Sequence, residues 1–428
     1  GGVILFEGRI AELATIVNEA PIAAVITALP RPNQAFWTLC ALWAGWLWGS
    51  ESAEPFHLVL RRRRYDWGWH LEALQAALQH VFELLKLDTP CLALMPEPEP
   101  NFLTAALAAG DVNGFRLQSL AMRTQHDAAQ IAWTRGERLH HEFADADVTA
   151  VRAAIRNHLT ARGEPTLYLP LHAAALSTLT ESHALTRPRQ PEDETIRAAA
   201  DIVRESLLGD ETLVLYRAGE SVDTGLWGLS QDSESAEPLS DRVEMAVVKF
   251  LIEHPNCAFD EILRDMAEHF RGLLTPSRGL VSEVLASYAE QAGGRWKLRA
   301  EDQPSARKAE LIQMADLLAS IGERLDFHTN RLDERTLVWE AGEKSEYVFH
   351  LKASAVLGRA VAESPYPRER SLLALPAGRA SLLAHKLGRD PALAARLDGF
   401  RFIKFRLVRT LAQLPALNQQ TFETQIVR

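Results

Sequence analysis

The residues best suited to chemistry in this sequence are basic side chains that could bind phosphate groups. Four of them are consecutive and directly follow an apolar run: Arg61, Arg62, Arg63 and Arg64. The guanidinium group presents a fixed fork of N–H donors that matches phosphate oxygens. The same four residues could equally form a solvated strand end whose charges pair with neighbouring carboxylates. The sequence leaves both interpretations open.

A second basic group lies in residues 240–299, whose pattern predicts three helices and then a β-hairpin. Thr275 and Pro276 have the residue types of an N-cap and a first helical position, so we expect the third helix to begin there. This order resembles a winged helix-turn-helix domain, in which a helix enters the major groove and the wing contacts the DNA backbone. The resemblance gives DNA-binding roles to Ser277, Arg278, Lys297 and Arg299.

A third basic group occurs near the C-terminus, in the run FRFIKFRLVR. If this run is a strand, alternation places Lys404 and Arg406 on one face, where they could contact phosphate. The formal net charge of the 428 residues is −10, which argues against sequence-independent coating of nucleic acid. Any contact with DNA is therefore expected to be local.

Cysteines and histidines do not form a metal-binding pattern. The three cysteines, Cys40, Cys91 and Cys257, lie far apart, and the 14 histidines lack the spacing of zinc ligands. We therefore expect no metal and a reducing, cytoplasmic location. The apolar run 36–48 is too short to span a bilayer, so no membrane association is expected. The start at Gly1 without methionine leads us to expect that an upstream portion is missing.

Hydrophobic periodicity predicts an α/β multidomain protein. In the first third of the chain, short apolar runs alternate with helical patterns, which is typical of a mostly parallel sheet covered by helices. Strands are expected at 3–8, 23–29, 56–61, 91–97, 115–124 and 130–136, the last two as an antiparallel hairpin, and helices at 66–87 and 101–110. Changes in composition predict four segments, 1–145 (α/β), 146–239 (helical linker), 240–303 (helices and hairpin) and 304–428 (α/β).

The stretch Thr27-Ala28-Leu29-Pro30-Arg31 carries a resemblance to a known family. The order of strand, proline-containing turn and aromatic helix resembles the amino-group DNA methyltransferases, in which a strand of a Rossmann-like sheet ends in Asp/Asn-Pro-Pro-Tyr/Phe. In that family the acid or amide oxygen and a proline carbonyl hold the base amine, and the aromatic ring stacks on the flipped base. Ala28 replaces the acid or amide, Leu29 the first proline and Arg31 the aromatic residue. The resembled family also needs a glycine-rich turn after a strand to bind the methyl donor, and none appears in this sequence, so we expect weak or absent binding of S-adenosylmethionine.

The residues after this motif could be the remnant of a base-binding pocket. Amides beside aromatic rings are how extruded bases are held, so the resemblance assigns this role to Asn33, Gln34, Phe36 and Trp37. Further tryptophans and leucines follow at helical offsets. We expect Trp43, Trp46 and Trp48 to pack in the core or between domains.

The segment after residue 304 resembles the restriction-endonuclease-like core, in which an acid on one strand and Glu-x-Lys on the next hold Mg²⁺ and orient water. The resemblance assigns these positions to Glu340, His350 and Lys352. His350 stands where the family has glutamate, which removes one metal ligand. An α/β accessory domain is therefore favoured over an active nuclease.

These features predict a DNA-methylase-like protein of a bacterial DNA modification or defence system. It is expected to bind DNA or a protein partner and not to act as a stand-alone enzyme. Two enzymatic alternatives remain open: an S-adenosylmethionine-dependent DNA amino-methyltransferase whose donor-binding motif lies upstream, and a nuclease that uses the C-terminal domain. S-adenosylmethionine is an expected cofactor only in the first alternative.

Overall fold

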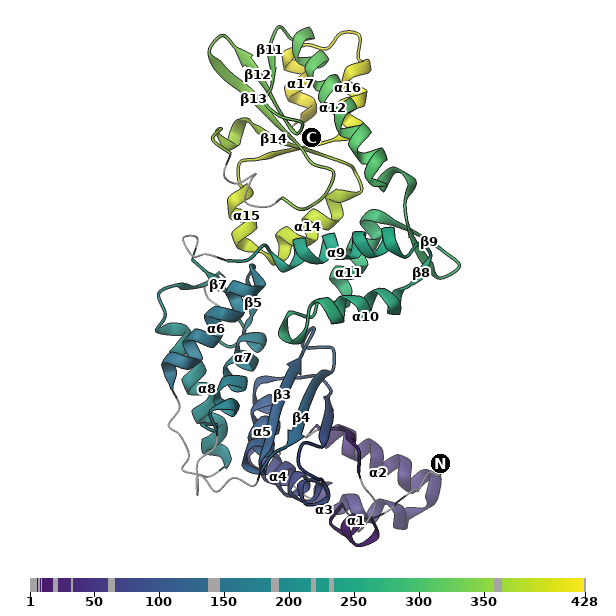
Figure 1. The fold of residues 1–428 in the computed structure, drawn as a ribbon, viewed down its shortest axis with the longest axis vertical. Helices are drawn as coiled ribbons and strands as arrows, with labels where there is room; N and C mark the ends of the chain where they lie inside the picture. Colours follow the sequence, from purple (N-terminus) through teal and green to yellow (C-terminus); the bar gives the residue numbers. More distant parts are fainter. Residues whose placement is uncertain are drawn as a thin grey trace. The chain divides into compact units, whose positions relative to one another are not determined.

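The chain folds into two compact mixed α/β units, seen in a computed structural model (Figure 1). The structure describes residues 6, 8, 10–17, 22–31, 34–60, 66–137, 147–185, 192–216, 221–230, 235–357 and 364–426. The first unit comprises 1–159, 166–230 and 272–275, and the second comprises 160–165, 231–271 and 276–428. The expected segments 240–303 and 304–428 thus fall almost entirely into one unit.

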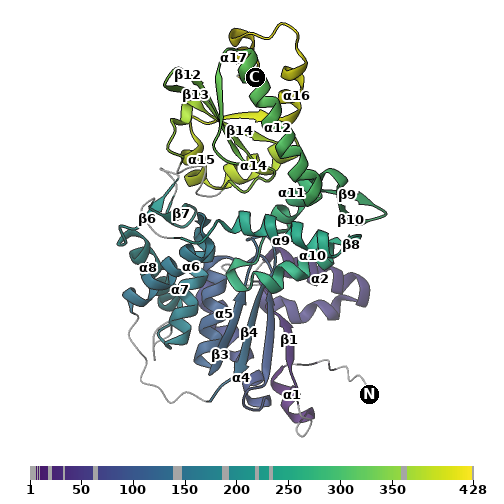
Figure 2. The same ribbon diagram turned by 45° about the horizontal axis from the view of Figure 1, so that its top comes forward.

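A four-stranded sheet organises the first unit. Its strands are β1 (Val25–Ala28), β2 (Pro90–Met95), β4 (Ala129–Arg135) and β3 (Phe115–Ala121), in that spatial order. Figure 2 shows β1 on the side of α2 (Gln34–Trp48) and β3 at the opposite edge. The β3–β4 hairpin is confirmed, but only β1 and β2 are parallel. The expectation of a mostly parallel sheet is therefore wrong for these four strands.

Helices and a small second sheet complete the first unit. The remaining elements are α1 (Ile10–Ile16), η1 (Ser50–Phe56), α3 (His57–Leu60), α4 (Trp67–Leu84), α5 (Pro100–Val112), α6 (Val148–Arg162), α7 (Tyr168–Glu181), α8 (Glu192–Leu208), β5 (Thr166–Leu167), β6 (Leu213–Leu215), β7 (Leu226–Leu229) and η2 (Gly272–Leu274). The expected strand at 56–61 is wrong, because residues 57–60 form α3. Residues 3–8 lie largely outside the described part of the chain.

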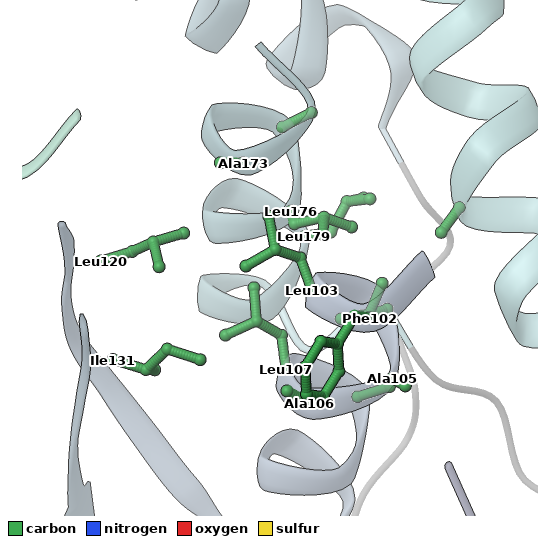
Figure 3. Packing of buried hydrophobic residues seen from close by; sticks show 14 of the residues in the cluster. Phe102, Leu103, Ala105, Ala106, Leu107, Leu120, Ile131, Ala173, Leu176 and Leu179 are labelled. Atoms are coloured by element: carbon green, nitrogen blue, oxygen red, sulfur yellow. The ribbon is translucent and has the colours of Figure 1, made fainter. Parts of the chain in front are cut away.

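Helix α5 is the centre of the first unit's core. Its side chains from Phe102 to Asp111 are buried, because small residues let neighbouring elements approach on every side. Figure 3 shows Leu103 and Leu107 between Leu120 and Ile131 of the sheet and the leucines of α7. An apolar surface on every side is typical of a helix that is buried in this way.

A buried histidine cluster fixes α7 against α5. Thr104 Oγ1 lies 3.0 Å from His172 Nε2, and Tyr168 Oη lies 3.1 Å from His172 Nδ1. Burial lowers the pKa of His172 to about 4, and the backbone of Pro100 acts weakly in the opposite direction. The ring is therefore neutral in the folded chain at neutral pH.

We expect His172 to make the first unit sensitive to acid. The unfolded chain binds a proton on this ring below about pH 6.5, whereas the folded chain does so only near pH 4, so stability is present above 6.5 and is lost as the pH falls. Between pH 7 and pH 5 the ring should reduce the free energy of unfolding by about 2 kcal/mol. Urea titrations at both pH values should show that His172→Gln loses about that much less than wild type.

The control for this measurement is His126→Gln, because His126 is exposed. That variant should lose as much stability on acidification as the wild-type chain. An unchanged acid loss in His172→Gln would contradict the prediction.

The second unit begins with three helices and a three-stranded sheet. Its first elements are α9 (Leu239–Glu253), β8 (Cys257–Ala258), α10 (Phe259–His269), α11 (Arg278–Tyr288), β9 (Ala289–Ala292) and β10 (Arg295–Leu298). The expected order of three helices and a hairpin is therefore present. The N-cap of α11 is Ser277 and not Thr275, since Ser277 Oγ accepts a hydrogen bond from the Leu280 N–H at 3.1 Å.

A five-stranded sheet with helices beside it forms the rest of the unit (Figure 1). The elements are η3 (Ala300–Asp302), α12 (Pro304–Arg324), β11 (His328–Arg331), β12 (Thr336–Ala341), β13 (Lys344–Leu351), η4 (Arg368–Arg370), β14 (Ser371–Leu375), α14 (Arg379–Arg389), α15 (Pro391–Leu397), β15 (Arg401–Lys404), α16 (Phe405–Gln413) and α17 (Gln419–Ile426). Strands β11 to β13 are antiparallel, and β13, β14 and β15 are parallel. Spatial order follows chain order.

Two buried cations from α14 join this sheet to the helices before it. Lys386 Nζ lies 2.5 Å from both Asp241 Oδ1 and Glu244 Oε2 of α9, and its side chain is fully buried. Arg379 pairs with Asp302, and its guanidinium group lies 3.3 Å from the centre of the Tyr288 ring. These contacts explain why the two expected domains form a single compact unit.

Loss of Lys386 should destabilise the second unit strongly. Lys386→Ala leaves two carboxylates buried without their cation, and breaking a buried pair in this way costs about 3–5 kcal/mol. The matched control is Lys249→Ala, which removes an exposed pair with Glu253 and should cost less than about 1 kcal/mol. Urea unfolding followed by circular dichroism measures both changes. Equal, small effects would contradict the structural role of Lys386.

Candidate functional site

The segment that resembles the methyltransferase motif, residues 27–31, lies where β1 ends beside β2. Ala28 is exposed and has no hydrogen-bonding side-chain atom, while Leu29 is buried. Arg31 pairs with Glu97 and lies 3.3 Å from Glu99, both in the segment after β2. The position that carries a stacking ring in the resembled family is therefore occupied by a charged group held by two carboxylates. This arrangement offers neither the oxygen acceptor nor the ring at these two positions.

A cavity of about 370 Å³ lies beside the motif segment, and apolar side chains of β1 and α4 form most of its wall. Trp37, Trp69 and His70 also line it. The Nε2 atom of His70 is buried and has no hydrogen-bond partner among the described residues. Burial lowers the pKa of His70 to about 4, against an opposing contribution from the backbone of Pro30. The cavity thus combines apolar walls with one neutral imidazole and the charged Arg31.

Of the four residues predicted as a base-pocket remnant, the structure describes the side chain of Trp37 alone. Trp37 lines the cavity, and its ring lies 6.1 Å from that of Phe56. For Gln34 and Phe36 the structure describes only the helical backbone of α2. Asn33 and the arginine run 61–64 lie outside the described residues.

The predicted cations of the α11 and wing region have intramolecular partners. Lys297 Nζ lies 2.9 Å from Glu290 Oε1 across the β9–β10 hairpin, and Arg278 lies 3.7 Å from Asp260. Arg299 donates to the carbonyl oxygens of Ser287, at 3.1 Å, and Ala286, at 2.7 Å, at the end of α11. Its guanidinium group therefore stabilises a helix end. The acidic neighbours of Lys297 and Arg278 lower the positive potential around these two side chains.

The basic run near the C-terminus is not one strand. Strand β15 ends at Lys404, and α16 begins at Phe405, so Arg406 is a helical residue. The expected sharing of a strand face by Lys404 and Arg406 is therefore wrong. Both residues are exposed, and neither has a side-chain ion pair within the described chain.

The endonuclease-like residues lie at two ends of the β12–β13 hairpin. Glu340 is opposite Ser345, whereas His350 is opposite Thr336. These two residue pairs are four positions apart along β12, which corresponds to about 13 Å. Lys352 lies still further from Glu340, just past the end of β13. The structure therefore brings His350 and Lys352 near each other but does not bring Glu340 to them.

The end of β13 opens instead onto a cavity of about 800 Å³, within the size range of ligand sites. Three cations line it: Arg335 before β12, Lys352 after β13 and Arg396 of α15. None of the three side chains has a hydrogen bond or ion pair with another described residue, and Arg396 Nε is buried. Glu237 and Asp241 line the same cavity, but Asp241 is already paired with Lys386.

The charges at this cavity influence one another. Burial lowers the pKa of Lys352, and the nearby Arg335 guanidinium lowers it further, while Asp333 acts in the opposite direction. Burial also lowers the pKa of His350 to about 4, which keeps that ring neutral. An anion placed beside Lys352 and Arg335 would relieve their mutual repulsion.

Sequence reasoning found Lys352 but missed Arg335 and Arg396. Arg335 directly precedes β12 and Lys352 directly follows its partner β13, so prediction of this hairpin would have brought the two residues to the same end. Arg396 lies 44 residues after Lys352 and carries no local signal. No group of three or more histidine, cysteine, aspartate or glutamate side chains suited to a metal ion occurs in the described ranges.

No helix in the described part of the chain is long and apolar enough to cross a membrane. Comparisons with family models, curated proteins and solved structures found no match to this chain. Its function is therefore inferred from its own residues.

Proposed function

We propose that this chain is a non-catalytic, DNA-methylase-like subunit of a bacterial DNA modification or defence system, and that its second unit binds the phosphate backbone of nucleic acid. The observation that carries the proposal is the set of unpaired cations at the 800 Å³ cavity. Arginine and lysine contacts to phosphate supply most of the affinity of such proteins. Three contacts are consistent with local binding by a chain of net charge −10.

The proposed domain types are supported by the order of elements. Three helices and a hairpin over 239–298 are consistent with a winged helix, and the five-stranded mixed sheet after α12 is consistent with an endonuclease-like domain. The parallel pair β1–β2, with the motif segment at the end of β1, is consistent with part of a methyltransferase-type sheet. Complex formation with a protein partner remains part of the proposal.

The chemistry of both degenerate sites favours binding without catalysis. Amino-methyl transfer needs an oxygen that holds the base amine, and residue 28 is alanine. Metal-dependent cleavage needs an acid beside the Glu-x-Lys position, and Glu340 is at the far end of its hairpin.

The phosphate-binding proposal predicts a specific loss in a triple variant. Arg335→Ala, Lys352→Ala and Arg396→Ala together should weaken binding to a fluorescein-labelled duplex at least tenfold. The slope of log affinity against log salt should become less negative by about 2.7, since three phosphate contacts are lost. Fluorescence anisotropy over a salt series measures both quantities.

A second triple variant removes equal charge at the sites predicted from sequence: Arg278→Ala, Lys297→Ala and Lys404→Ala. It should change the affinity by less than about threefold, because two of these cations are paired with acids. Equal losses of affinity in both variants would mean that binding depends on the net charge of the chain and not on the cavity. A loss only in the second variant would place the contact on the helix and wing, and a loss in neither would point to Arg61–Arg64.

The proposal also predicts no methyl transfer. Isothermal titration with S-adenosylmethionine should show no micromolar binding, and labelled methyl groups should not pass to plasmid DNA. Binding in the micromolar range, together with transfer that is abolished by Pro30→Ala, would establish the enzymatic alternative instead.

A further inference from the structure

Helix α2 has an unusual surface for a helix on the outside of a unit. Its 15 residues, QAFWTLCALWAGWLW, include no charged side chain. The helix nevertheless exposes a large apolar set: Leu39 (53%), Leu42 (67%), Trp43 (49%), Trp46 (76%), Leu47 (57%) and Trp48 (75%). These exposed fractions contradict the expectation that Trp43, Trp46 and Trp48 pack in the core of their own unit.

The exposed area of α2 exceeds what a lone unit usually shows. With side-chain areas of roughly 150–250 Å² for the larger residues, the six exposed fractions amount to about 800 Å² of apolar surface. The largest apolar patch on a typical monomer is about 300–600 Å². One partner in a standard protein interface buries about 800 Å². The α2 face therefore has the size of one half of an interface.

The absence of charged side chains on the α2 face indicates which kind of partner can cover it. Helices that lie on lipid surfaces carry lysine and arginine on a polar face, and α2 has none. A two-fold contact places the same patch of each copy against itself, so any charge on it would meet a like charge. An uncharged face of leucine and tryptophan avoids that repulsion, even though the chain as a whole carries −10. Neighbouring rings such as Trp43 and Trp46, 5.2 Å apart, form a compact apolar centre.

We propose that two copies of this chain associate through α2, with Leu42, Trp43 and Trp46 at the centre of a two-fold interface. Small residues, Ala41 and Ala44, face inward and are buried, so the large side chains point outward. Aromatic residues at the centre of an interface contribute a large share of its binding energy.

Sedimentation velocity of the full chain tests the proposal over a concentration range of about 1–100 µM, which covers interfaces of this size. The wild-type chain should change from monomer to dimer across the range. Leu42→Glu and Trp46→Glu should each raise the dimer dissociation constant at least tenfold. Circular dichroism should stay unchanged, because both side chains are mainly exposed.

The matched control is Leu208→Glu, since Leu208 in the same unit is 63% exposed and Leu42 is 67% exposed. This variant should dimerise like the wild-type chain. A dimer that both α2 variants leave unchanged would overturn the assignment of the interface. A wild-type chain that stays monomeric throughout would overturn the second copy as the occupant of this face.

Discussion

The architecture of the second unit depends on two cations buried beneath its sheet. Lys386 and Arg379 come from one helix, and their carboxylate partners come from α9 and from the turn before α12. Ion pairs removed from water are costly unless every partner is present, so the helices and the sheet must assemble together. The consequence is that the helix and hairpin segment cannot behave as an independent DNA-binding module attached by a linker. Its surface is presented in a fixed relation to the cavity at the end of β13.

Three of the five described cations that the sequence suggested as DNA contacts have partners within the chain. Lys297 and Arg278 lie beside acids, and Arg299 holds the end of α11. In a chain with 56 acidic and 46 basic residues, an unpaired cation in a cavity is more informative than a basic run in the sequence. The proposed phosphate contacts are therefore Arg335, Lys352 and Arg396, which line such a cavity.

The two segments that resemble catalytic motifs lack catalytic groups for different reasons. At the end of β1 the residue types themselves offer no side-chain acceptor at residue 28, and Arg31 pairs with two glutamates. In the β12–β13 hairpin the candidate acid, Glu340, is present but lies at the opposite end of the hairpin from His350. The apolar face of α2 likewise carries no charged side chain, and it is large enough for an interface.

The sequence by itself determined the mixed α/β class, the β3–β4 hairpin and the order of helices and hairpin in 239–298, because these follow from local periodicity and turn residues. It also determined that residue 28 offers no side-chain acceptor, because alanine has no hydrogen-bonding side-chain atom. Tertiary structure alone decided that residues 57–60 are helical, that β15 ends at Lys404 and that Trp46 is exposed. The exposure of Trp46 could not be predicted, because an apolar helix has the same sequence pattern whether it is buried or exposed. Tertiary structure also decided which cations are paired, because an ion pair depends on segments far apart in the chain.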